Sequence, residues 1–151
     1  MKLKVKLVIC VVIACVCFLF SGCFKLSAGS HERKADMYLT EAKTTLSREI
    51  DVDADKLTVY WSGEYFPEQQ YRYRVHDWSS SYNSVSEITP RNEDRVIKDE
   101  EVRRLVSRAV NHSYNSERAS LLSDIMTLIA WAAIVAMPIV ALWHFVVRVI
   151  N

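Results

Sequence analysis

Residues 125–147 read IMTLIAWAAIVAMPIVALWHFVV, and this segment decides how the rest of the chain is interpreted. None of its 23 residues is Lys, Arg, Asp or Glu. As an α-helix the segment would extend about 34 Å, enough to cross the roughly 30 Å hydrocarbon core of a bilayer with some tilt. A surface helix of a soluble protein would carry charge along one side. The sequence therefore predicts a transmembrane helix over 125–147, kinked near Pro138.

A second apolar run, residues 7–20, follows three lysines and precedes the small residues Ser21 and Gly22 and then Cys23. A charged start, an apolar stretch and small residues after it are the three parts of an export signal. As a helix this run rises only about 21 Å. Extension to Phe24 gives about 27 Å, so an uncut membrane span is an alternative to a cleaved signal.

The stretch Phe20-Ser21-Gly22-Cys23 resembles the lipobox of bacterial lipoproteins, with Phe20 in place of the usual leucine or other aliphatic residue. The resemblance covers only the first 24 residues. It implies that a signal peptidase cuts before Cys23, which then carries the lipid as the first residue of the mature protein. The expected organisation is a signal peptide 1–22 (or an uncut anchor), a lipidated tether 23–31, an exported domain 32–116, a transmembrane helix 125–147 and a cytoplasmic tail 148–151.

The charges at the two ends predict the topology. Lys2, Lys4 and Lys6 precede the first apolar run and Arg148 follows the second, and positive residues favour the cytoplasmic side of a membrane. The domain between the two runs is then extracytoplasmic. We expect the inner membrane, because a 23-residue apolar helix does not suit the outer membrane, although the lipoprotein resemblance alone implies transport there.

The composition of the middle of the chain excludes several classes of function. Residues 25–124 contain 15 Lys and Arg against 18 Asp and Glu, and a net charge of about −3 makes nucleic acid a poor partner. All four cysteines (Cys10, Cys15, Cys17 and Cys23) lie before this region, which leaves it without a disulfide framework. Small extracellular domains of eukaryotes usually depend on disulfides, so a bacterial or phage protein is favoured.

The exported domain is expected to be a small α+β unit. Apolar residues recur at helical spacing over 32–50, while 57–61 and 71–78 are typical of two strands of a hairpin. A second helix is expected to begin near residues 89–92 and to end within 111–116. The predicted fold class is therefore a membrane-anchored α+β protein, with a helix–hairpin–helix domain followed by one C-terminal transmembrane helix.

No motif for catalysis or metal binding is found in the sequence. Three alternate aspartates over 51–55 have the spacing of the start of a calcium loop, but Lys56 stands where that loop requires glycine. His76 and Asp77 are adjacent on a predicted strand and would point to opposite faces, so they do not form a catalytic pair. We therefore expect no enzyme, no cofactor and no metal site.

The aromatic residues are concentrated between Tyr60 and Tyr82, a stretch that holds half of those in the chain. Together with neighbouring arginines they form a candidate surface for a glycan, a peptide or a protein. The alternative is that one set of rings packs on the helices and the rest are ordinary cross-strand pairs. The candidate binding residues are Trp61, Tyr65, Phe66, Tyr71, Arg72, Tyr73, Arg74 and Trp78.

Two classes of function follow from these features. The first is a non-enzymatic envelope protein, in contact with membrane lipid, that assembles with a protein partner or with further copies of itself. Candidate settings are a subunit of an envelope complex or a phage- or plasmid-encoded exclusion or lysis factor. The alternative is a small membrane-bound enzyme that acts on a cell-wall or lipid substrate.

Overall fold

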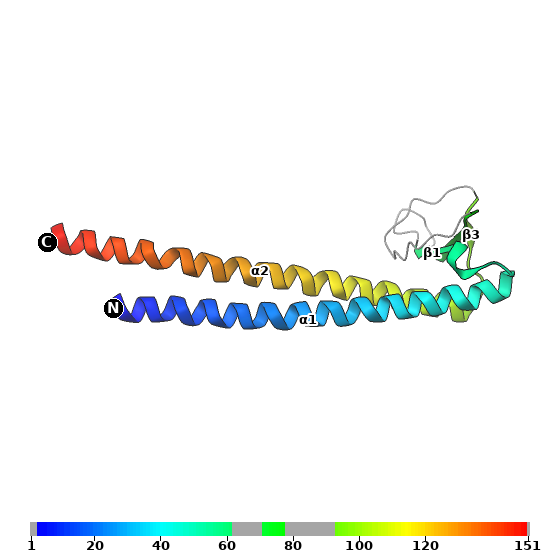
Figure 1. Cartoon of the computed structure of the whole chain (residues 1–151), viewed down its shortest axis with the longest axis horizontal. Coiled ribbons are helices and arrows are strands. Elements are labelled where there is room, and N and C mark those ends of the chain that lie inside the picture. Colours follow the sequence, from blue (N-terminus) through cyan, green and yellow to red (C-terminus); the bar gives the residue numbers. More distant parts are fainter. Residues whose placement is uncertain (1–2, 62–70, 78–92, 151) are drawn as a thin grey trace. The chain divides into compact units, whose positions relative to one another are not determined.

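The computed structural model describes residues 3–61, 71–77 and 93–150, and the chain divides into two compact units. One unit, called the helical pair below, consists of Met1–Ala28 and Glu117–Asn151. The other, called the head, consists of Gly29–Ser116. Two long helices, α1 (Leu3–Ile50) and α2 (Glu100–Ile150), contribute to both units (Figure 1).

The head adds a short helical turn and a small sheet to parts of these two helices. The elements between α1 and α2 are η1 (Ala54–Lys56), β1 (Leu57–Trp61), β2 (Tyr71–Val75) and β3 (Arg95–Val96). β2 lies in the middle of the sheet and pairs antiparallel with both neighbours. In this register Val59 lies opposite Tyr73, and Tyr73 lies opposite Arg95.

The predicted fold class is wrong. The protein is mainly helical, with an apolar segment in each of two long helices, and it is not a helix–hairpin–helix domain followed by a single C-terminal span. Residues 23–31, expected as a tether, and residues 111–116, expected to end a helix, are both helical. Polar residues such as Ser and Asn reduce helix stability by only up to about 0.7 kcal/mol each, and packing of one helix face outweighs that cost.

The second helix also begins later than the sequence predicts. Residues 89–92 lie outside the described part of the chain, Arg95–Val96 forms β3, and α2 begins at Glu100. Asp99 fixes this start, because its Oδ1 accepts a hydrogen bond from the backbone N–H of Val102 at 2.7 Å. An aspartate in this place satisfies a free donor of the first turn and stabilises the positive end of the helix dipole.

The end of α1 is closed by a residue in the left-handed backbone conformation. Asp51 has φ of 54°, and the N–H of Val52 donates to the carbonyl of Ser47 at 3.2 Å. This is the hydrogen bond of a Schellman motif, in which glycine usually occupies the left-handed position. The chain turns here from α1 toward the sheet, and Val52 packs against the core of the head.

We expect Asp51→Gly to raise the free energy of unfolding of the head by about 1 kcal/mol, because the left-handed conformation costs a non-glycine residue about 1–2 kcal/mol. Hydrogen exchange of the full chain in nanodiscs measures this as slower exchange of β1 and β2. Asp53→Gly is the matched control, since Asp53 has φ of −56° and gains nothing from glycine. Unchanged or faster exchange of Asp51→Gly would show that the aspartate side chain stabilises the turn.

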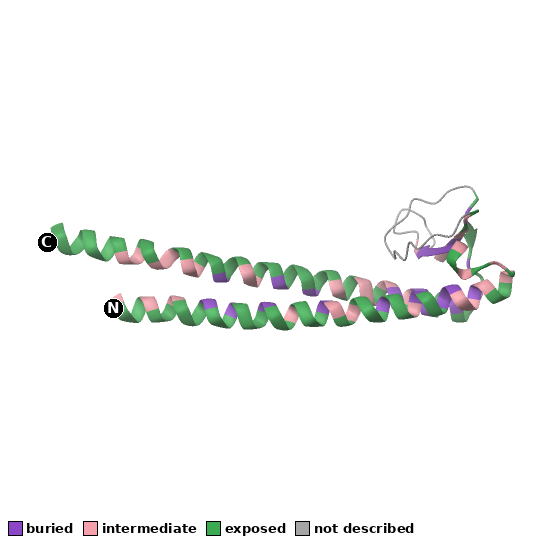
Figure 2. Ribbon diagram, in the orientation of Figure 1, coloured by how far each residue is buried: buried purple, intermediate pink, exposed green. Residues whose placement is uncertain are grey.

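The core of the head lies between the sheet and the two helices. Leu57 and Val59 of β1 face this core, whereas Thr58 and Tyr60 point to the opposite face of the sheet, as the two-residue period of a strand requires. Figure 2 shows the buried residues of the two helices and β1 in purple. The core residues are Leu39, Ala42, Leu46, Leu57, Val59, Tyr73, Ile97, Val102, Leu105, Val106 and Ala109.

In the helical pair, α1 and α2 contact each other through small side chains and one polar cluster. The Oγ of Ser21 lies 3.0 Å from the Oγ of Ser123 and 2.8 Å from the Oγ1 of Thr127. The ring of Phe18 meets that of Trp131 edge to face, with centroids 6.2 Å apart. Small residues let two helices approach closely, and hydroxyl groups then bond across them. The buried residues of this seam are Ala14, Cys17, Ser21, Ala28, Ala119, Ser123 and Ala130.

Candidate functional site

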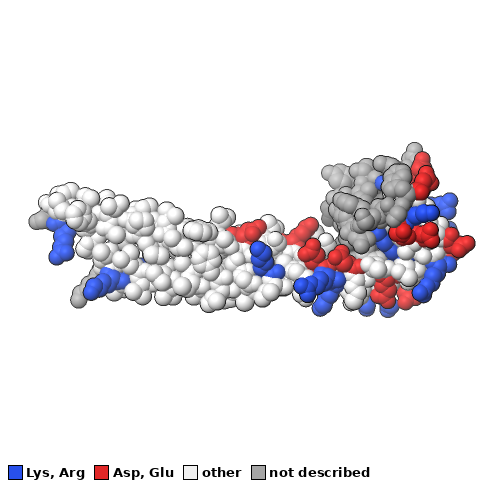
Figure 3. All heavy atoms as spheres, viewed as in Figure 1, with Lys and Arg blue, Asp and Glu red and all other residues white. Residues whose placement is uncertain are grey.

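The outward surface of the helical pair is apolar. In the most apolar window of each helix, only 11% of α1 and 6% of α2 is buried inside the protein. A helix from the interior of a soluble protein would be mostly buried, and an exposed apolar surface of this extent needs another environment. On the face drawn in Figure 3, a long stretch of the helical pair shows neither Lys and Arg (blue) nor Asp and Glu (red).

Both helices are long and apolar enough to cross a membrane. The expectation of a single C-terminal span is therefore corrected, because the structure has two candidate spans. The sequence favours a cleaved signal over 1–22, with an uncut anchor as the alternative, because residues 7–20 alone are short for a span; in the structure they continue in an unbroken helix through Phe24 and beyond. An N-terminal signal sequence has the same apolar composition.

Cys23 and Ser21 lie on different sides of α1. Ser21 is buried in the seam with α2, whereas Cys23 is exposed and forms no disulfide. An exposed thiol is accessible for acylation, and the lipidation of Cys23 stays a prediction. Cleavage before Cys23 would remove Ser21 together with Ala14, Cys17 and Phe18, and thus most of the contacts that α1 makes within the helical pair.

The second region of interest is a buried ionic cluster on the polar face of the sheet. Asp94, just before β3, has a fully buried side chain. Its carboxylate accepts two hydrogen bonds from Arg74 (Nε to Oδ1 at 2.6 Å and Nη2 to Oδ2 at 2.7 Å) and one from the hydroxyl of Tyr60 at 2.5 Å. The backbone carbonyl of Asp94 accepts a further bond from Arg72 at 3.5 Å. The cluster thus ties β3 to both other strands.

The strand register explains why these groups meet. Thr58 lies opposite Arg74 and Tyr60 opposite Arg72, so all four side chains lie on the face of the sheet away from the core. Burial and the hydrogen bond to Asp94 raise the pKa of Tyr60 far above its ordinary value, so this phenol stays protonated. The same carboxylate raises the pKa of Arg74. Tyr60 and Arg74 therefore both keep their protons near neutral pH.

The structure gives the predicted binding residues different environments. Tyr73 is buried in the core, and Trp61 and Tyr71 are half-buried. Arg74 is engaged with Asp94, and Arg72 bonds to the backbone of the same residue. Tyr65, Phe66 and Trp78 lie outside the described residues. Whether this set binds a ligand stays a prediction.

His76 and Asp77 directly follow β2. The Nε2 of His76 lies 2.8 Å from the hydroxyl of Thr58, while Asp77 is exposed. Over residues 3–61, 71–77 and 93–150, no group of three or more His, Cys, Asp or Glu side chains is placed to hold a metal ion.

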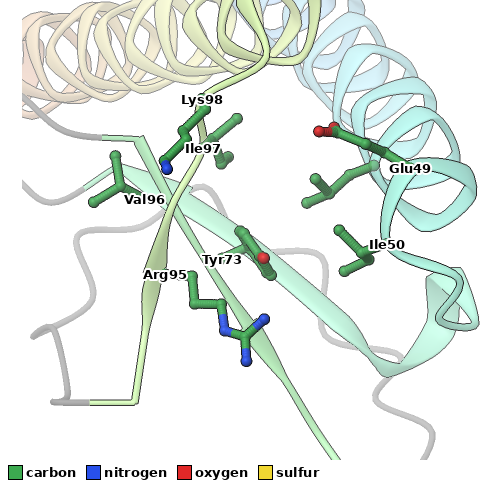
Figure 4. A pocket seen from close by; sticks show the side chains of 8 residues that line it. Glu49, Ile50, Tyr73, Arg95, Val96, Ile97 and Lys98 are labelled. Atoms are coloured by element: carbon green, nitrogen blue, oxygen red, sulfur yellow. The ribbon is translucent and has the colours of Figure 1, made fainter.

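A crevice of about 500 Å³ opens between the end of α1 and β3, as Figure 4 shows. Its lining includes the apolar or aromatic residues Ile50, Tyr73 and Ile97 and the charged residues Glu49, Arg95 and Lys98. A hollow of about 400 Å³ next to it shares Ile50, Tyr73 and Arg95.

Sequence reasoning missed Asp94, the residue that organises the polar face of the sheet. Its partners Tyr60 and Arg74 are 34 and 20 positions away, and nothing in the local sequence marks one acidic residue among several as buried. The alternation of arginine with ring residues in β2 did predict a strand with two unlike faces.

Comparisons of the sequence with models of known protein families and with curated proteins, and of the fold with solved structures, find no match.

Proposed function

We propose that this protein is a non-enzymatic module of the bacterial envelope, in which both long helices cross the inner membrane and present the head on its outer face. The observation that carries the proposal is the exposed apolar surface of two adjacent helices joined to a head that has its own core. A bilayer covers such a surface, and the head needs no help from lipid to bury its apolar side chains.

The seam between the helices favours retention of the N-terminal helix as a span. The hydroxyl of Ser21 hydrogen-bonds with the hydroxyls of both Ser123 and Thr127. The hydroxyl of Thr127 also donates to the carbonyl of Ser123 at 2.9 Å. In hydrocarbon an isolated polar side chain has no water to bond to, so a helix carrying Ser21 gains from a partner. A signal peptide removed after export has no need of these partners.

The charge distribution supports one orientation. Lys4 and Lys6 lie at the start of α1, and Arg148 lies at the end of α2. Positive residues favour the cytoplasmic side, so both chain ends lie inside and the head lies outside. The apolar crevice beside β3 gives the head a surface suited to a protein partner.

Protease treatment of spheroplasts followed by mass measurement of the protected fragments tests the proposal. We expect two membrane-protected fragments, one that starts at Met1 with an unmodified Cys23 and one that contains residues 125–147. Cys23→Ala should give the same pair of fragments, because retention of the helix does not depend on the thiol. The physical reason is that each protected segment is covered by the bilayer, whereas the head is accessible.

Other outcomes separate the alternatives. A fragment that begins at Cys23 and carries the mass of acyl chains, absent from Cys23→Ala, would establish a lipoprotein and reject the two-span arrangement. Protection of the head in spheroplasts would reject the proposed orientation. A full-length protein found in the soluble fraction would reject membrane insertion itself.

A further inference from the structure

Two histidines join α1 and α2 inside the head, close to the positions where the head begins and ends in the chain. His31 on α1 and His112 on α2 are separated by 81 positions, and their Nδ1 atoms lie 2.8 Å apart. The ring centroids are 5.1 Å apart, so the rings meet edge to edge with the two nitrogens between them. This is a hydrogen bond between two imidazoles.

The pair is part of a column of rings. The ring of Tyr38 stacks on His112, with centroids 5.6 Å apart and planes 17° from parallel. The guanidinium of Arg108 lies over the other ring of this stack, 5.7 Å from the centroid of Tyr38. His31, Tyr38, His112 and Arg108 thus connect α1 to α2 through one continuous set of contacts. The stack holds His112 in the orientation that directs its Nδ1 toward His31.

The hydrogen bond between these nitrogens has room for only one hydrogen. In the neutral pair, one imidazole donates through Nδ1–H and the other accepts with the lone pair of its own Nδ1. A single added proton is tolerated, because the charged ring then donates to the neutral one. When both rings are charged, both Nδ1 atoms carry hydrogen, and the bond is replaced by repulsion between two cations.

The charges around the pair oppose that second proton. The cation that acts on His112 is Lys34 on α1, Tyr38 is the other titratable group in contact with His112, and Arg108 on α2 lies over the ring of Tyr38. Within the described part of the head, no carboxylate forms an ion pair with either imidazole. Burial, together with His31 and Lys34, lowers the pKa of His112 below its ordinary value.

The surroundings also favour a proton over a metal ion in this position. A zinc ion needs its ligand nitrogens about 2.0–2.1 Å from a common point, with their lone pairs aimed at that point. Here the nitrogens face each other across 2.8 Å, and the cation Lys34 lies close enough to lower the pKa of His112. No third ligand of the usual types completes a site in the described residues.

We propose that the His31–His112 pair is a pH-sensitive clasp, which holds α1 and α2 together at the base of the head at neutral pH and releases them when both rings become protonated. Its physiological use rests on the proposed location, because a head on the outer face of the membrane meets the pH of the surroundings. The clasp itself depends only on the contacts within the head.

The direction of the pH effect follows from the lowered pKa of His112. Between that value and the ordinary value of 6.5, the unfolded or opened chain binds more protons than the closed one. The stability that the His31–His112 pair gives to the closed form is therefore complete above about pH 6.5. It is lost as the pH falls through 6.5 toward the pKa of His112 in the closed form.

Hydrogen exchange of the full chain in nanodiscs, followed by mass spectrometry at pH 7.5 and pH 5 and corrected for the intrinsic rates, measures the clasp. We expect the amides around His31 and His112 to exchange several-fold faster at pH 5 than at pH 7.5, because the hydrogen bond between the two imidazoles is lost when both rings carry a proton. His112→Asn keeps a polar side chain that does not titrate, and His112→Phe keeps the stack on Tyr38 without the hydrogen bond. Both should abolish the pH dependence.

His76→Asn is the matched control, because this histidine bonds to Thr58 in the sheet, and its substitution should leave the pH dependence near His31 intact. A wild-type protein that exchanges equally at both pH values would overturn the clasp. So would a pH dependence that survives in His112→Asn and His112→Phe. Protection of the same amides by added Zn²⁺ at pH 7.5, lost in His112→Asn, would identify a metal site instead and would also overturn it. Because nanodiscs contain no cell envelope, these results do not depend on the proposed topology.

Discussion

Asp94→Ala is expected to lower the free energy of unfolding of the head by about 3–5 kcal/mol, the range found when one partner of a buried ion pair is removed. The side chain of Asp94 is fully buried and that of Arg74 is 16% exposed, so the guanidinium left behind has little access to water. The hydroxyl of Tyr60 is also left without its acceptor, and Tyr60 is 0% exposed. Amides of β1 and β2 should exchange at least a hundredfold faster in the full-length protein.

Two further variants test whether the loss of stability is specific to the buried cluster around Asp94. Tyr60→Phe removes a single hydrogen bond to a charged acceptor and should cost about 1.5–3 kcal/mol, less than the loss of the carboxylate. Asp53→Ala removes an ion pair with Lys56 whose two side chains are 71% and 41% exposed, and it should change stability by less than about 1 kcal/mol. Equal effects of Asp94→Ala and Asp53→Ala would contradict a dominant role of the buried cluster.

The second large effect is expected in the helical pair, where Ala130→Phe should separate the two helices. Ala130 is 0% exposed and lies in the seam, so a phenyl ring has no space there. Overpacking costs about 1–3 kcal/mol, and loss of the hydrogen bonds between Ser21 and its partners adds about 0.6–2 kcal/mol. Energy transfer between dyes on the two chain ends, measured in nanodiscs, should fall as the pair opens.

Ala132→Phe is the control for this experiment, because Ala132 is exposed on the same helix and the added ring meets the surroundings instead of α1. Energy transfer should then stay at the wild-type level. If both variants lowered it equally, bulk anywhere on α2 would explain the effect. If neither did, the helices would not be held together by the seam.

The features that the sequence predicts well are those with a local period or a long uniform run. The absence of charge over 125–147 identified a candidate span without further information. The strand predicted at 57–61 is β1, and it pairs antiparallel with β2. In each case the residues that carry the pattern lie within a few positions of one another, so neighbouring side chains determine the structure.

The features that it does not predict depend on contacts between distant parts of the chain. In the local sequence, Ser21 is a small residue near an expected cleavage site. It belongs to the seam because Ser123 and Thr127, more than 100 positions away, lie within hydrogen-bond distance of it. Residues 111–116 contain weak helix formers and were expected to end a helix, yet His112 continues α2 and bonds to His31. Packing on one helix face decided the structure there, and local propensity did not.

The seam of the helical pair also imposes an order on biosynthesis. Ser21 is separated from Ser123 by 102 positions, so the first helix is made long before its partner exists. At about 5–20 residues per second, this helix waits roughly 5 to 20 seconds with its polar group unmatched. The head is delayed in the same way, since its core needs side chains from both α1 and α2.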